Sequence, residues 1–296
     1  MASLGDGSQG SIAGGTAGLR VGRRVSWEGV RKVLLLFAWR LALGLAFLAV
    51  WQFASGRFIS TFWFSQPTLI FGYLSTYLLG EGTVFEGKLI SDVVITLRAM
   101  ITGYLLGAAA GLFLGFLLAQ WPMAAQVLRP YLLAIYGVPR IALAPIFILW
   151  FGIGIESKIM LAAMLAFFMT FFNTFTGIQS VDLGLKNVAR VMGAKQLALV
   201  IKVILPAASP WIIAGLRVSI PYALVAAVVG EFIASSAGLG FRLVLAQQQF
   251  DTAGVMAGIF ILMSIVMFFN MILDQVEGYV LRWRPVEERK THGGAF

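Results

Sequence analysis

The sequence predicts an all-α polytopic membrane protein of about six transmembrane helices, and its composition and long apolar runs carry that prediction. Of the 296 residues, 59% are hydrophobic and only 12% are charged, and the mean hydropathy is +0.89. A soluble domain carries about 25% charged residues, so this chain has too little charge to cover a surface that faces water. The apolar residues also form runs of roughly 20, the length that a helix needs to cross a bilayer core.

The apolar runs divide the chain into two polar tails and one transmembrane domain. We expect a flexible, basic tail over residues 1–32, the transmembrane domain over 33–281 and a short tail over 282–296. The first span should be an uncleaved anchor, because no small-residue cleavage site clearly ends it. The six spans are expected at about 33–54, 96–119, 126–150, 159–178, 214–234 and 255–280.

Glycines and prolines predict how the spans pack and bend. Four glycines in the second span recur at every fourth residue, which places them on one helix face that another helix can approach closely. They are Gly103, Gly107, Gly111 and Gly115. Prolines are expected to break the third and fifth spans, as pathway-lining helices often are, although plain kinks are equally common. These prolines are Pro130, Pro139, Pro145 and Pro221.

The net charge of +9 lies mainly beside the apolar runs, as the positive-inside rule expects of cytoplasmic loops. Both termini and the segment 179–209 are basic, whereas acidic residues outnumber basic ones in 55–92. We therefore expect both termini and 179–209 in the cytoplasm and 55–92 outside, with no nucleic-acid partner. Trp51, Trp121 and Trp150, near span ends, are expected in the interfacial belt.

Several kinds of active site are disfavoured by composition. Cysteine is absent and the single histidine, His292, lies in the C-terminal tail, which argues against zinc and Ser-His-Asp sites. Residues 82–88, GTVFEGK, match the spacing of a phosphate-binding loop, but Leu89 stands where a Mg²⁺-binding hydroxyl is needed. We interpret this match as a coincidence and expect no ATPase, other enzyme activity, metal or cofactor in this chain.

Residues 187–210, NVARVMGAKQLALVIKVILPAASP, predict a helix–turn–helix knob on the cytoplasmic surface. Gly193 would allow a turn with positive φ between two short helices, and Pro206 after Leu205 should end the second one. The knob has basic flanks and an apolar stripe, which suit docking into a groove of another protein. The stripe consists of Val188, Val191, Met192, Leu197, Val200 and Ile201.

This segment resembles the EAA loop of the binding-protein-dependent permeases of ABC importers. The family pattern is Glu-Ala-Ala, three residues, Gly, nine residues, Ile, one residue and Leu-Pro. The corresponding residues here are Asn187, Val188, Ala189, Gly193, Val203, Leu205 and Pro206. Asn187 replaces the usual Glu, so a charge contact at this position is not expected, whereas the docking role is unaffected. The alternative is that residues 187–210 are an ordinary connection between spans with no docking role.

The resemblance extends from Thr96 to about Asn270 and is closest to the nitrate/sulfonate/taurine subclass. It is carried by residues 139–154, by Asn173 and Gly177, and by 215–240, which include Glu231 and Gly238-Leu239-Gly240.

The resemblance implies an ABC importer type I permease (MetI-like) fold in the bacterial inner membrane. It further implies a homodimer, two cytoplasmic ATP-binding subunits that hold ATP and Mg²⁺, and an extracytoplasmic solute-binding protein. Selectivity would lie largely in that binding protein, and the substrate would be a small anion or a related small organic molecule. The coupling loop would span 181–208, and the coupling residues would be Asn187, Ala189, Arg190, Gly193, Ala194, Lys195, Leu205 and Pro206.

Three residues are candidates for the translocation pathway. Glu231, late in the fifth span, is either a pore-facing or gating group or a structural carboxylate paired within the bundle. Arg140 either faces the pathway and favours an anion, or snorkels or pairs structurally. Asn173, in the fourth span, is the third candidate.

Two other functions remain as alternatives. A stand-alone secondary transporter or channel should show paired intramembrane carboxylates or an inverted repeat, and neither is evident. A membrane-embedded enzyme would need several polar catalytic residues at one depth. Neither alternative accounts for the knob.

Overall fold

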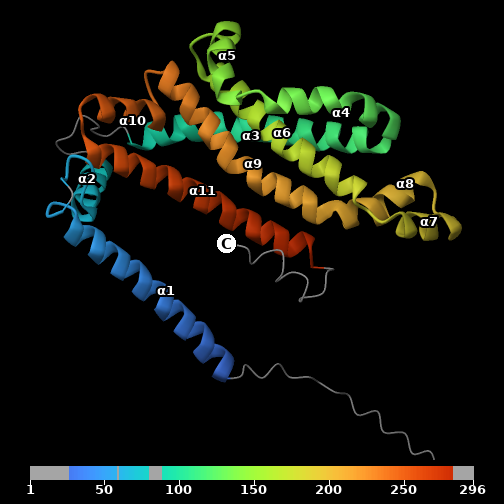
Figure 1. Cartoon of the computed structure of the whole chain (residues 1–296), viewed down its shortest axis with the longest axis horizontal. Coiled ribbons are helices and arrows are strands. Elements are labelled where there is room, and N and C mark those ends of the chain that lie inside the picture. The colour runs from blue at the N-terminus through green and yellow to red at the C-terminus, as the bar shows by residue number, and fades with distance from the viewer. Residues whose placement is uncertain (1–26, 59, 80–88, 283–296) are drawn as a thin grey trace, which may run out of the picture. The chain divides into compact units, whose positions relative to one another are not determined.

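The computed structural model describes residues 27–58, 60–79 and 89–282. The chain divides into two compact units after Val50, and the bundle described below belongs to the second unit. The long helices are α1 (Trp27–Ala54), α3 (Leu89–Gln120), α6 (Ile155–Gln179), α9 (Leu205–Ile233) and α11 (Thr252–Val280) (Figure 1). The shorter elements are α2 (Pro67–Leu79), α4 (Pro122–Gly137), the 3₁₀ turn η1 (Arg140–Leu143), α5 (Ala144–Phe151), α7 (Leu183–Val191), α8 (Gln196–Leu199), the π-helical turn η2 (Val200–Ile204) and α10 (Leu239–Gln248).

Helices α3, α6 and α9 pack against one another and form the centre of the bundle. Small side chains dominate where they meet, so the helix axes approach closely, as they do where membrane helices associate. The fully buried alanines of this core are Ala99, Ala162, Ala166, Ala223, Ala226 and Ala227.

The glycines of α3 face α6, which confirms the close approach expected from their spacing. A Cβ atom at Gly103 would lie 2.5 Å from the Cβ of Ala162. One at Gly111 would lie 2.7 Å from the carbonyl oxygen of Phe167, and one at Gly115 would lie 2.8 Å from that of Phe171. The backbone of α6 therefore occupies the space that side chains on this face of α3 would need.

Five of the described helices are long and apolar enough to cross a membrane, and α4 with η1–α5 makes a sixth crossing if that bent pair is one span. The two parts of the pair meet at 82°. Val138 is extended there, as a residue before proline tends to be, and Pro139 has no N–H to continue the helix.

Only one of the expected proline breaks is therefore a sharp one. Helices α4 and α9 continue through Pro130 and Pro221, while Pro145 lies in the first turn of α5, where proline costs little.

Some sequence-based boundaries were wrong. Helix α1 begins at Trp27, so the expected tail is too long by part of a helix. The polar segment 55–92 contains α2, and its last residues begin α3, so Asp92 lies on a helix rather than in a loop. Trp51 does not face lipid but is buried, donating from Nε1 to the carbonyl oxygen of Ser65 at 2.9 Å.

Candidate functional site

The predicted knob is present as α7, a turn and α8. Asp182 caps α7 by accepting the N–H of Gly184 at 2.5 Å. Gly193 has a φ of +83°, which confirms the predicted left-handed turn. The turn is closed by the N–H groups of Gly193 and Ala194, which donate to the carbonyls of Arg190 at 2.9 Å and Ala189 at 3.0 Å.

One side of the knob packs on the bundle and the other faces outward. Leu199 and Ile204 are buried against Ile178, and Ala189 packs partly against them. Val191 and Met192 are 89% and 82% exposed at the end of α7. These exposed apolar side chains contribute nothing to the core of this chain, so they are available to a partner.

The predicted coupling residues occupy different sides of this knob. Asn187, Arg190 and Lys195 are exposed, whereas Ala189 and Ala194 are partly buried beneath them. Leu205 and Pro206 lie farther along the chain, at the start of α9.

The expectation that Pro206 ends the second helix was wrong. Helix α8, η2 and α9 form one helical run, Gln196–Ile233. The N–H of Leu205 donates to the carbonyl of Val200, five residues back, and this wider turn immediately precedes the proline. Because Pro206 lies in the first turn after this change of pitch, its missing N–H does not interrupt the run.

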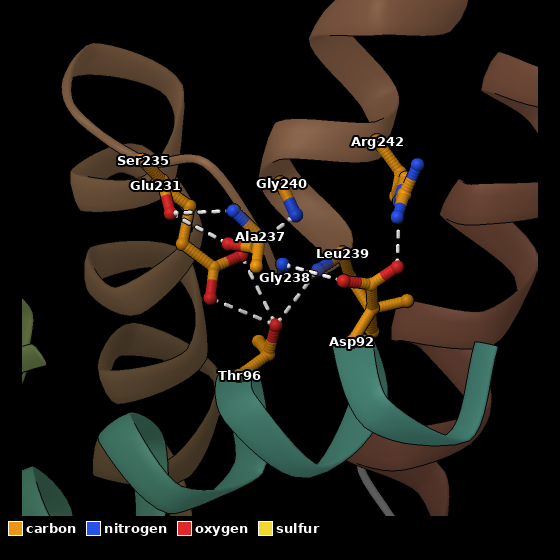
Figure 2. Close-up of polar contacts among 9 residues, drawn as sticks. All are labelled: Asp92, Thr96, Glu231, Ser235, Ala237, Gly238, Leu239, Gly240 and Arg242. Carbon is orange, nitrogen blue, oxygen red and sulfur yellow. Dashed lines mark hydrogen bonds and ion pairs between the residues drawn. The ribbon is translucent and has the colours of Figure 1, made fainter. Parts of the chain in front are cut away.

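Glu231 lies at the far end of the same helical run and is only 1% exposed. Its side chain points toward Thr96 and the start of α10 (Figure 2). Its carboxylate accepts the hydroxyl of Thr96, which lies 2.9 and 3.0 Å from the two oxygens. It also accepts the N–H of Gly240 at 2.7 Å. The carboxylate is therefore paired within the bundle, between α3, α9 and the start of α10.

Asp92 completes this polar cluster from α3. Its two oxygens accept the N–H of Gly238 at 2.8 Å and Nε of Arg242 at 2.6 Å. The N–H of Leu239 donates to the hydroxyl of Thr96 at 2.9 Å. Three consecutive N–H groups that begin α10 thus find side-chain acceptors, where a helix end otherwise leaves its donors unsatisfied.

Two glycines permit this geometry. Gly238 has a φ of +109°, and a Cβ there would collide with the Glu231 carboxylate. A Cβ at Gly240 would lie 2.7 Å from the carbonyl oxygen of Val228. Beside them, the buried Lys158 donates from Nζ to the hydroxyl of Ser235 at 2.7 Å, which fixes the connection between α9 and α10.

Arg140 lies elsewhere, at the break between α4 and α5. Its guanidinium carbon stands 4.5 Å from the ring centroid of Tyr136. Both residues line a cavity of about 510 Å³, whose other walls include Leu165, Pro221 and Tyr222.

Asn173 does not line that cavity. Its Nδ2 donates to the carbonyl of Met169 at 2.8 Å, and its Cβ lies where a side chain at Gly215 would need to be. The structure therefore does not bring Glu231, Arg140 and Asn173 together, and their place in a pathway stays a prediction.

Sequence reasoning missed several polar residues. Asp92 and Thr96 are one helical turn apart in an apolar stretch, and that spacing could have marked them as neighbours on one face. Arg217 on α9 contacts two carboxylates on α11, Asp274 at 2.6 Å and Glu277. Nothing in the sequence pairs these residues. The phosphate-loop-like match at 82–88 lies outside the described residues.

Comparisons with known proteins agree with this architecture. Residues 107–283 match the family described as binding-protein-dependent transport system inner membrane component. The chain is 35% identical over 244 residues to the putative aliphatic sulfonates transport permease protein SsuC of Bacillus subtilis, covering 82% of this chain and 87% of that protein.

Two further comparisons extend the similarity. The formylaminopyrimidine transport permease protein ThiX of Halalkalibacterium halodurans is 30% identical, covering 81% of this chain and 93% of that protein. An inward-facing structure of the MetNI methionine ABC transporter has the same fold, with a TM-score of 0.58 at 20% identity, covering 65% of this chain and 95% of that chain.

Proposed function

Because this chain belongs to the family of binding-protein-dependent transport system inner membrane components, it is the permease subunit of an ABC importer, and we propose how it works there. It acts as a homodimer in the inner membrane, on two cytoplasmic ATP-binding subunits that hold ATP and Mg²⁺. Both termini lie in the cytoplasm, and an extracytoplasmic binding protein delivers the solute. The chain itself performs no catalysis.

The knob carries this proposal. It exposes Val191 and Met192 beside the basic Arg190 and Lys195, a surface that fits a groove on a partner. Exposed apolar side chains of this kind are costly in water unless another protein covers them. The ATP-binding subunit is the partner that the family requires at this position.

The helical run Gln196–Ile233 supports a mechanical role for the knob. At 1.5 Å per residue it is about 55 Å long and begins at the knob. When the ATP-binding subunits close, they draw the two knobs together, and this continuous helical run carries the displacement to Glu231 and α10. The pathway thereby switches between its inward-facing and outward-facing states.

The relatives support a small solute as the substrate. One is named for aliphatic sulfonates and another for formylaminopyrimidine, which are small organic molecules of different charge. We propose that this permease carries a sulfonate-like anion or a related small organic molecule.

Co-purification of the tagged permease with its ATP-binding subunit tests the role of the knob. Met192→Glu places a charge on the exposed apolar surface without touching the core, so we expect the ATP-binding subunit to be lost. Ile153→Glu is the matched control, since Ile153 is 79% exposed and precedes α6, whereas the knob follows it.

Retention of a stoichiometric ATP-binding subunit by Met192→Glu would contradict the docking role. Uptake of solute by the purified permease alone in liposomes would favour the secondary transporter instead.

A further inference from the structure

We propose that the cavity beside Arg140 is a binding site inside the permease for a small organic anion, with its charged head on Arg140 and its apolar body against the cavity wall. This inference rests on the proposed importer function and adds a selective site within the membrane to it.

The cavity is built by two proline-containing segments. The break at Pro139 turns Arg140 away from the axis of α4, and α9 contributes Pro221, Tyr222 and Val225. Its volume of about 510 Å³ lies within the range of small-molecule sites. Apolar side chains make up most of its lining, which suits a molecule with a hydrocarbon body better than a bare inorganic ion.

Arg140 is a cation without a counter-charge among the described residues. Its Nη1 is buried and has no hydrogen-bond partner there. Arg217 and Arg242, in contrast, each contact carboxylates. A guanidinium within a bilayer that lacks a partner is costly, so an anion that enters the cavity gains from pairing with it.

The guanidinium of Arg140 rests on an aromatic ring and keeps a donor for an oxyanion. Arg140 stands over the ring of Tyr136 with its Cζ 4.5 Å from the ring centroid, an arrangement that holds the group by cation–π attraction. Nη1 has no hydrogen-bond partner among the described residues, so the guanidinium keeps N–H donors for a ligand. A sulfonate or carboxylate matches their forked geometry.

The depth of the cavity favours a transported solute over a lipid head group. Leu165 and Pro221, which line it, lie near the middle of α6 and α9. At 1.5 Å per residue, each is about 15 Å or more from either end of its helix. That distance is half the thickness of a bilayer core, so a lipid phosphate lies far from these walls.

Saturation-transfer NMR on the permease complex in nanodiscs tests the site directly, with butanesulfonate as the probe and no binding protein present. We expect saturation of the butyl protons with the wild type and a roughly tenfold or greater loss of affinity in Arg140→Gln, the scale of charge-assisted hydrogen bonds. Arg140→Lys should bind more weakly than wild type, because it keeps the charge but loses the fork. Nitrate should compete poorly.

Arg98→Gln is the matched control, because Arg98 lies on α3, also within a candidate span, and does not line the cavity. It should bind the probe as the wild type does. Equal binding by Arg140→Gln, or no binding by a wild-type complex that hydrolyses ATP, would overturn the site and leave the importer function standing. Loss of the ATP-binding subunit from the wild-type preparation would instead count against the importer function.

Two further measurements distinguish other partners for Arg140. Displacement of butanesulfonate when phosphatidylglycerol replaces phosphatidylcholine in the discs would assign the site to a lipid. Dissociation of a permease dimer by Arg140→Gln, seen by native mass spectrometry, would assign the counter-charge to a second copy. Either result would overturn the solute site.

Discussion

Glu231 and Asp92 are buried carboxylates whose oxygens accept backbone N–H groups at the start of α10. Gly238 donates to Asp92, Gly240 donates to Glu231, and Leu239 donates to Thr96, which itself donates to Glu231. Buried polar groups that satisfy one another in this way fix one arrangement of the elements that carry them. At the scale of single residues, this cluster holds α10 against α3 and α9.

Replacing Glu231 with Leu should destabilise the purified permease. The change leaves the N–H of Gly240 and the hydroxyl of Thr96 without their acceptor, at roughly 1–3 kcal/mol for each buried group. The midpoint of thermal unfolding, followed by circular dichroism, should fall clearly in Glu231→Leu. It should fall less in Glu231→Gln, because the amide oxygen can still accept a hydrogen bond from these donors.

Glu156→Leu is the control for this measurement, since Glu156 is an exposed carboxylate in the first turn of α6. Its unfolding midpoint should stay close to that of the wild type. If Glu231→Leu instead unfolds like the wild type but no longer transports, the carboxylate acts in the pathway and not as a structural partner.

The glycine-lined contact between α3 and α6 sets how the central helices pack. At Gly107 a Cβ would collide with the backbone of Ala163, and at Gly111 a Cβ would lie 2.7 Å from the carbonyl oxygen of Phe167. Since backbone atoms cannot turn away as a side chain can, a larger residue must push the two helices apart.

Gly111→Ala should therefore lower the free energy of unfolding by the cost of overpacking, about 1–3 kcal/mol, and with it the unfolding midpoint. The new Cβ would lie 2.7 Å from the carbonyl oxygen of Phe167 and 2.9 Å from the backbone nitrogen of Phe171. Gly278→Ala on α11 is the control, because nothing stands within 4 Å of its added Cβ. The free energy of unfolding of Gly278→Ala should be unchanged or rise by up to about 1 kcal/mol, because alanine has the higher helix propensity. Equal unfolding midpoints for the two variants would contradict this prediction, because they would show that α6 moves away from the added Cβ at no cost in stability.

At the scale of the whole molecule, the charge distribution predicts which end of the bundle faces the cytoplasm. The chain has no cysteine, so single cysteines report accessibility without background. Met192 and Ile153 are 82% and 79% exposed, beyond opposite ends of α6.

In intact cells, a membrane-impermeant maleimide should label Ile153→Cys and not Met192→Cys, and inverted vesicles should give the reverse pattern. This outcome follows if the basic knob is cytoplasmic, as the positive-inside rule predicts. Labelling of Met192→Cys from outside in intact cells would contradict the orientation and, with it, docking to a cytoplasmic ATP-binding subunit.

The sequence by itself determined the membrane class, the glycine face of α3 and the turn at Gly193. Each of these depends on local chemistry: the length of apolar runs, a spacing of four residues on a helix, and the backbone freedom of one glycine. The spacing from Gly193 to Leu205-Pro206 also pointed to the family that the comparisons then showed.

Only the tertiary structure decided which polar residues meet and which prolines break a helix. Asp92 and Thr96 are far in sequence from Glu231 and Gly238, and only packing of α3 against α9 and α10 brings them together. The helices continue through Pro130, Pro206 and Pro221, whereas the chain breaks at Pro139, where Val138 is extended. Contacts between distant segments and small changes of helical pitch depend on how the whole bundle packs, and a local pattern of residues does not encode them.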